Sequence, residues 1–139
     1  MARSTSFRIS EDTRALLTGQ AMRRGVTVTS LLEQLVLEGT TQLDHPDLVF
    51  RGPIHDRRAG LASGPDVWEV VVRLQELPGS EQERIDLLCE ESDLSPREAR
   101  VALDYAAQNP GPIRARIERH HAEISRSQAA AKARAELLS

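Results

Sequence analysis

The first pattern along the chain is an alternation of apolar and polar side chains just after the N-terminus. One face holds Thr5, Phe7 and Ile9, and the other holds Ser4, Ser6, Arg8 and Ser10. A period of two predicts a short β-strand with one apolar face. Because so short a strand needs a paired edge, we expect it to pair with the same strand of a second copy, in an antiparallel ribbon that makes the protein a homodimer. The alternative is a strand with a structural role only.

The spacing of apolar residues then becomes helical over residues 10–39. Ser10 is placed to cap the first helix, and Gly25 tolerates the left-handed conformation that ends many helices. Thr27 is placed to cap a second helix, which we expect to end at Gly39. The apolar positions are Ala15, Leu16, Gly19 and Met22 in the first helix, and Leu31, Leu32, Leu35 and Val36 in the second.

Beyond this segment the pattern changes to that of a small, separate helical domain. Residues 40–46 read as a polar connector, and the apolar run at 48–50 predicts a short strand. From Val67 to Leu74 apolar residues recur at steps of three and four, which predicts a helix. Because valine favours strands, a strand is the minority alternative there.

Two Ser-x-x-Glu sequences, which begin at Ser80 and Ser95, form capping boxes and predict two further helices. Their expected buried residues are Ile85, Leu88, Cys89, Ala99, Ala102, Leu103 and Ala106. Trp68 and Tyr105 are expected to anchor the core rather than an interface. The last of these helices should stop at Asn109, because Pro-Gly follows.

Residues 112–139 form one long helical pattern with an apolar stripe and an excess of basic residues. The stripe consists of Ile113, Ile117, Ile124, Ala131, Ala135 and Leu138. It offers too little apolar area for this segment to fold alone. We therefore expect it to order in the groove of a partner protein. The expected partner-binding residues are Ile113, Arg116, Ile117 and Ile124. The alternative is a frayed, solvated C-terminus.

Composition narrows the functional classes. The chain has 139 residues, a net charge of −3 and a pI near 5.8, so nonspecific coating of nucleic acid is disfavoured. Residues 1–30 nevertheless hold five arginines against two acids, which makes this end locally basic. Cys89 is the only cysteine, which suits a reducing cytoplasm. The N-terminal sequence has no signal-peptide pattern, and no apolar run is long enough to span a bilayer, so no membrane partner is expected.

The sequence gives little support for catalysis. The four histidines, His45, His55, His120 and His121, are too scattered for a metal set, because adjacent histidines on a helix diverge. Cys89 lies in a predicted helix with no basic activator beside it, which favours a buried, inert thiol. The glycines do not form a phosphate-binding loop. We expect no active site, no metal and no cofactor.

The strand phase FRIS, the Gly25-Val26-Thr27 corner and the length of about 40 residues resemble the ribbon-helix-helix family of DNA-binding proteins, of the MetJ/Arc/CopG type. This resemblance implies that a dimer lays its ribbon in the major groove of operator DNA. The implied base-reading residues are Ser4, Ser6 and Arg8, and the implied phosphate-binding residues are Thr27, Val28 and Thr29. The implied dimer core consists of Thr5, Phe7, Ile9, Leu31, Leu32 and Leu35. Serines specify little, so Arg8 would supply most of the discrimination.

The second segment carries another resemblance. GPDVWEVV followed by LSPREARVALDYAAQNP is similar to a VapB-like antitoxin domain, domain-of-unknown-function family 433, over roughly residues 45–118. Residues 57–59 correspond only loosely to the Gly-x-Arg strand of that family. The resemblance implies a small domain of homeodomain-like or winged-helix type, and a partner toxin that is usually a PIN-like ribonuclease. Arginines of the C-terminal segment would reach the acidic active site of such a nuclease.

Together these patterns predict a mainly α fold in three parts. They are a ribbon-helix-helix domain (1–43), a small helical bundle (44–111) and a C-terminal helical tail (112–139). The expected function is that of a cytoplasmic type II antitoxin that represses its own operon, as a dimer or as neighbouring dimers on one operator.

The alternative is a stand-alone repressor in which helices at 80–91 and 95–108 form a helix-turn-helix, with Arg97 and Arg100 facing DNA. A weaker third possibility is an accessory factor in plasmid partition or relaxation.

Overall fold

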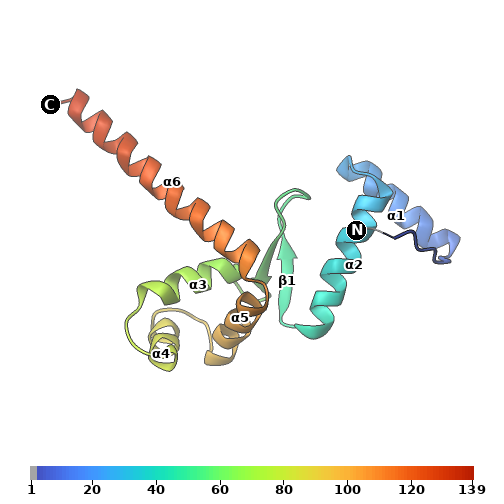
Figure 1. The fold of residues 1–139 in the computed structure, drawn as a ribbon, viewed down its shortest axis with the longest axis horizontal. Coiled ribbons are helices and arrows are strands. Elements are labelled where there is room, and N and C mark those ends of the chain that lie inside the picture. The colour runs from blue at the N-terminus through green and yellow to red at the C-terminus, as the bar shows by residue number, and fades with distance from the viewer. Residues whose placement is uncertain (1–2) are drawn as a thin grey trace. The chain divides into compact units, whose positions relative to one another are not determined.

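The computed structural model describes residues 3–139, and the chain divides into two compact units, Met1–Asp44 and His45–Ser139 (Figure 1). In the described residues the fold is mainly helical, with one small antiparallel sheet. The elements, in order, are α1 (Glu11–Arg24), α2 (Val28–Asp44), β1 (Leu48–Arg51), β2 (Arg58–Leu61), α3 (Val67–Glu76), α4 (Glu81–Glu91), α5 (Pro96–Gln108) and α6 (Pro110–Leu137). The expectation of a mainly α fold is confirmed.

The two helices of the first unit begin and end at the residues that the sequence marks. Ser10 Oγ accepts a hydrogen bond from the Thr13 backbone N–H at 3.1 Å, and Thr27 Oγ1 accepts one from the Ser30 N–H at 3.0 Å. Gly25 ends α1 in the left-handed conformation, with a φ of 65°. These three predicted helix boundaries are confirmed, and they show that the corner between α1 and α2 is determined locally.

The end of α2 differs from the prediction. The helix continues through Gly39 to Asp44, so most of the expected polar connector is helical. A glycine weakens a helix without having to end it, and the Thr40 hydroxyl here donates to the Val36 carbonyl at 2.7 Å. The helix stops two residues before Pro46, whose ring disfavours helical geometry in the residue that precedes it.

Residues 3–10 form no strand in the single chain. Their side chains are exposed, including Phe7 at 85% and Ile9 at 50%. A ladder of hydrogen bonds needs a second edge, and the predicted edge belongs to another copy of the chain. The ribbon therefore stays a prediction.

The second unit begins with a β-hairpin. β1 and β2 pair antiparallel, from Leu48 opposite Leu61 to Arg51 opposite Arg58, which confirms the strand predicted at 48–50. Gly52 starts the connecting loop with a φ of 104°, and a Cβ at this position would collide with the Asp56 carbonyl. The loop conformation therefore requires a glycine there.

Helices α3 to α6 pack beside the hairpin around an aliphatic core. Residues 67–76 are helical, so the strand alternative for this segment is wrong. Both predicted capping boxes are present: Ser80 caps α4 and Ser95 caps α5. The buried core residues are Leu48, Ala59, Leu61, Val67, Val70, Val72, Leu74, Leu77, Ile85, Leu88, Ala99, Ala102, Ile113 and Ile117. Trp68, Cys89, Leu103, Tyr105 and Ala106 are partly buried against this core.

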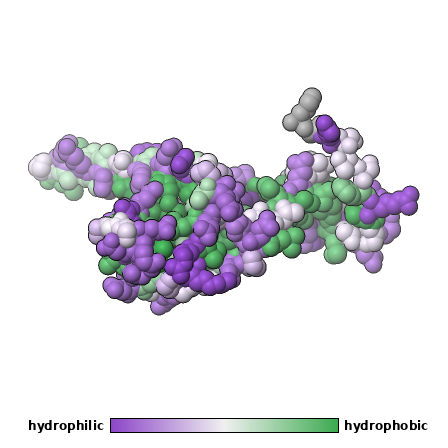
Figure 2. Space-filling view, turned by 60° about the horizontal axis from the view of Figure 1, so that its bottom comes forward, coloured by the Kyte–Doolittle hydropathy of each residue, from purple (hydrophilic) through white to green (hydrophobic). Residues whose placement is uncertain are grey.

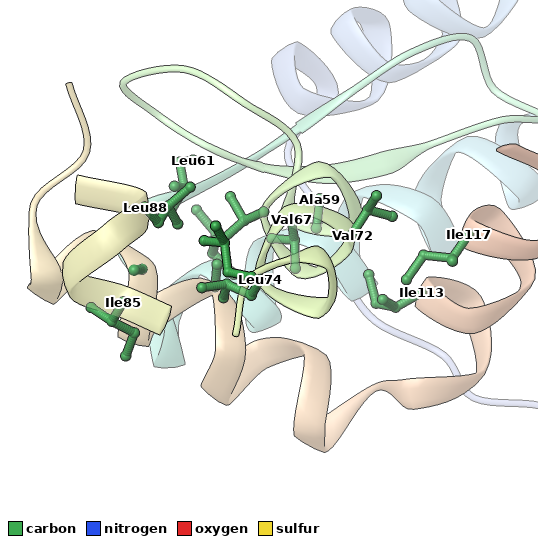
Figure 3. Packing of buried hydrophobic residues seen from close by; sticks show 14 residues of the cluster. Ala59, Leu61, Val67, Val72, Leu74, Ile85, Leu88, Ile113 and Ile117 are labelled. Carbon is green, nitrogen blue, oxygen red and sulfur yellow. The ribbon is translucent and has the colours of Figure 1, made fainter. Parts of the chain in front are cut away.

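The first turns of α6 belong to this core. Figure 3 shows Ile113 and Ile117 beside Val72 of α3. α5 and α6 are separated by a single non-helical residue, Asn109, and α6 begins at Pro110, two residues earlier than predicted. Proline is well suited to a first helical position, where no partner for its missing N–H is needed.

Candidate functional site

The first unit leaves one apolar side of α2 exposed. Leu31 is buried, at 2% exposure, whereas its neighbours Leu32 and Leu35 are about half exposed. Figure 2 shows hydrophobic side chains at the surface of this unit. We define the α2 face as the side chains that helical spacing places together there: Leu32, Leu35, Val36 and Leu43. Leu43, which is 82% exposed, was missed by the sequence reasoning because α2 was predicted to end at Gly39.

All six residues that the resemblance assigns to DNA are exposed. Ser4, Ser6 and Arg8 lie on the extended segment before α1, and Thr27, Val28 and Thr29 lie at the start of α2. The exposed start of a helix presents free backbone N–H groups, which bind anions such as phosphate. The base-reading residues and the phosphate-binding residues are therefore both accessible. They lie on different parts of the unit, the extended segment and the start of α2.

The structure corrects part of the predicted partner surface. Ile113 and Ile117 are 8% and 7% exposed and pack in the core of their own unit, so they are not available to a partner. Core packing and partner docking produce the same apolar periodicity, and only the fold separates them. Of the four predicted partner-binding residues, Ile124 remains clearly exposed, at 42%.

Arg116, the fourth of these residues, forms part of a charged cluster. Its Nη1 donates to both carboxylate oxygens of Asp56, at 2.8 and 3.0 Å, and the Arg119 Nη2 lies 3.4 Å from Oδ1. The Arg116 guanidinium also lies 5.6 Å from the ring centroid of Trp68, which in turn packs against His120. A polar cavity of about 200 Å³ adjoins the cluster.

The hydrogen bond from Arg116 lowers the pKa of Asp56 below its ordinary value. This carboxylate therefore stays charged at neutral pH and ties the hairpin loop to α6. Nothing in the sequence near Asp56 indicated this link to α6, because Arg116 and Arg119 lie 60 and 63 residues away along the chain; Asp56 also forms an ion pair with its near neighbour Arg58 at 3.6 Å.

A second ion-pair network lies between the hairpin and the start of α3. Asp66, at the start of α3, is 7% exposed and accepts hydrogen bonds from Arg51 Nη1 at 2.8 Å and from Arg58 Nε at 2.7 Å. Burial raises the pKa of Asp66, but the hydrogen bonds from Arg58 and Arg51 outweigh this effect and leave the pKa below its ordinary value. Glu69 accepts a hydrogen bond from the Asp66 N–H at 3.0 Å. These groups join the hairpin to α3, and we interpret their role as structural.

Beyond His120, no residue of α6 belongs to the core cluster, and the residues there are exposed. Figure 1 shows this part leaving the other helices of its unit. The side of α6 that holds Ile113 and Ile117 continues outward as what we name the outer stripe: Ile124, Ala131, Ala135 and Leu138. The same helix side is thus buried at one end and open at the other.

Charge in the second unit is unevenly distributed along the sequence. Residues 59–108, which include α3, α4 and α5, hold eleven acids and four arginines. The hairpin segment 48–58 and α6 together hold nine basic residues and four acids. The helical body is therefore acidic, whereas the hairpin and α6 are basic.

Other candidate chemistry is weak in the described residues. No group of three or more His, Cys, Asp or Glu side chains is placed there to hold a metal ion. Burial raises the pKa of the Cys89 thiol, which disfavours the reactive thiolate form. Within residues 3–139, none of the helices combines the length and hydrophobicity that a membrane span needs.

Comparison of the chain with protein-family models, with curated proteins and with solved structures finds no match.

Proposed function

We propose that this protein is a cytoplasmic, homodimeric antitoxin that binds operator DNA through its N-terminal unit, represses its own operon and neutralises a cognate toxin through its second unit. The observation that carries the proposal is the exposed α2 face, together with Phe7 and Ile9. Apolar side chains gathered on one side of a small unit mark an interaction surface. A second copy that pairs through residues 4–10 would cover both sets.

The DNA-binding part of the proposal is supported by charge and by helix geometry. Arg8 and the two serines are exposed, and the start of α2 is open to an anion. Ser10 and the Gly25-Val26-Thr27 corner, which belong to the segment that resembles the ribbon-helix-helix family, supply the caps of α1 and α2. Direct reading of DNA would rest mainly on Arg8, because serine bonds either base or water.

The partner-binding part is supported by the outer half of α6. The outer half of α6 is exposed, and most helical stability in proteins comes from packing an apolar face, so a partner that covers the outer stripe would stabilise it. We propose that the partner is a toxin, of the PIN-like ribonuclease type that the resemblance implies. Co-purification of the chain with the product of a neighbouring gene tests this part, and loss of that complex on Ile124→Glu would support it.

The helix-turn-helix alternative is less favoured. The segment that includes α4 and α5, residues 80–108, holds eight acids and three arginines, which opposes binding to phosphates. Arg97 forms an ion pair with Asp47 at 2.7 Å, and Arg100 lies 3.5 Å from the side chain of Gln82. A stand-alone repressor that uses only its N-terminal unit would bind DNA equally well and would purify without a toxin.

The decisive experiment compares two leucines on α2. Leu35→Glu changes the α2 face, whereas Leu37→Glu changes a similarly exposed leucine about 200° around the helix. We expect Leu35→Glu to yield a monomer by sedimentation and to lose binding to DNA from upstream of its own gene. Leu37→Glu should stay dimeric and bind. A wild-type chain that is monomeric and binds no DNA, or equal behaviour of the two variants, would refute the proposal.

A further inference from the structure

The body of the second unit has an open apolar groove where α3, α4 and α5 meet. Its volume is about 320 Å³. It is lined by Val71, Leu74, Gln75, Gly79, Glu81, Arg84 and Leu103. Arg84 is held by backbone carbonyls, since its Nε donates to Gly79 at 2.8 Å and its Nη1 donates to Leu74 at 3.2 Å. The groove is therefore an ordered surface, and its floor is mainly aliphatic.

The outer stripe of α6 has the opposite character. Three of its apolar side chains lie on one side of an exposed helix that extends about 25 Å past His120, at 1.5 Å per residue, and the fourth, Leu138, caps the end of this helix. Lys132 and Arg134 flank the stripe on its two sides, because they lie about 60 to 100° around the helix from Ala131 and Ala135, in opposite directions. A narrow apolar ridge with cationic edges suits an apolar groove in an acidic surface.

The outer stripe cannot reach the groove of its own chain. α6 is one continuous helix whose start is fixed in the core by Ile113 and Ile117, and Figure 1 shows its outer half pointing away from α4. An occupant of the groove must therefore come from another molecule.

We propose that this occupant is the outer stripe of a second copy of the chain. The two surfaces match in charge, because residues 59–108 have seven more acids than arginines and α6 has three more basic residues than acids. Pairing two outer stripes with each other would bring like charges together and would bury mainly two alanines, an isoleucine and a leucine per chain. This is short of the three to four heptads that a coiled coil usually needs. The contact of an outer stripe with a groove is therefore better matched than the contact of two outer stripes.

Such a contact is head-to-tail. Each chain offers both a stripe and a groove, so the contact builds rings or open chains of molecules, or a closed pair in which each stripe lies in the other chain's groove. This inference does not depend on DNA or toxin binding. Where a toxin covers the outer stripe, it would compete with the groove of the neighbouring copy, so that toxin binding and self-assembly would exclude each other.

Cross-linking between full-length chains tests the proposal directly. Cys89→Ser removes the native cysteine, and Gln75→Cys then places a single thiol at the groove of one chain. A second chain carries Ala131→Cys, on the outer stripe, or Ala133→Cys, on the opposite side of α6. Both alanines are exposed, so neither substitution should prevent folding.

On mixing and mild oxidation, we expect the Ala131→Cys chain to form about tenfold more disulfide with the groove chain than the Ala133→Cys chain does. The difference should shrink in about 1 M salt, where surface charges are screened. Ile124→Glu in the stripe chain should abolish the excess. Because any N-terminal dimer would hold both alanine variants equally, equal yields from the two would overturn the proposal and leave a foreign protein as the occupant of the stripe.

Discussion

Arg116 in α6 donates hydrogen bonds to both carboxylate oxygens of Asp56, a residue in the hairpin loop 60 positions earlier in the chain. Ile113 and Ile117, on the same helix as Arg116, are buried in the core of the unit. α6 is therefore anchored by apolar packing and by the charged contacts of Arg116 and Arg119 with Asp56, and its outer half begins just past this anchor. The contact sets where the basic helix leaves the unit.

Arg116→Ala should destabilise the second unit by about 1 kcal/mol, since the side chain is one-quarter exposed and its ion pair is partly screened. The loss of its contact with the Trp68 ring adds to the effect. Urea unfolding measures the change, and the exposed neighbour Arg114→Ala is the control. Equal loss in the two variants would show that the Asp56 contact contributes nothing measurable.

Stability should also fall in acid because of Asp66. Its pKa is lower in the folded protein than its ordinary value, which is about 3.9 in an unfolded chain. The unfolded state therefore binds protons first as the pH falls, so this stabilisation is complete above about pH 5 and is lost progressively as the pH drops further, through the lowered pKa of the folded state. Asp66→Asn should cost about 2 kcal/mol near neutral pH, because Arg51 and Arg58 lose their partner, and should flatten the acid slope. Thermal unfolding between pH 2 and 7 tests this, and an unchanged slope would contradict it.

The boundaries that the sequence predicted well are those with a local physical signal. Ser10, Ser80 and Ser95 each accept a hydrogen bond from a backbone N–H three residues later, at the start of a helix. Such a helix start can be predicted without knowledge of the rest of the fold. Gly25 belongs to the same class, because a positive φ is a property of one residue. Gly39 carries no such requirement in a helix, and for that reason it was a poor marker of the end of α2.

The parts of the candidate site that could not be predicted depend on distant partners. Asp56 and Arg116 are 60 residues apart, and no periodicity connects them. Ile117 and Ile124 look alike in the sequence, since they lie seven residues apart on one helix side, yet α3 covers only the first of them. The point at which a helix leaves its core depends on how the whole unit packs. The folded structure is therefore needed to separate the buried part of the stripe from the part that is a candidate binding surface.

Two glycines offer a matched test of helix chemistry in the first unit. Gly39→Ala should stabilise α2 by about 0.5 to 1 kcal/mol, because Gly39 is in a helix interior and no atom would meet the added methyl group within the single chain. Gly25→Ala should destabilise the unit by about 1 kcal/mol, since alanine is strained at a φ of 65°. Chemical unfolding of both variants measures the difference. A Gly39→Ala chain that is less stable, and whose loss depends on protein concentration, would instead place a second copy against Gly39.

The proposed roles on DNA separate Arg8 from Thr29. Arg8→Ala should lower the discrimination between operator and unrelated DNA by about 1 to 3 kcal/mol, because a lost base contact affects one sequence more than another. Thr29→Ala should weaken binding to both DNAs by the same factor, since phosphate contacts position the protein without specifying sequence. Fluorescence anisotropy with both DNAs at one fixed salt concentration measures these changes, and Arg14→Ala, in the same basic end of the chain, controls for the loss of one positive charge. If Arg8→Ala and Arg14→Ala weaken operator and unrelated DNA alike, Arg8 contributes only charge and the ribbon does not read the bases through it.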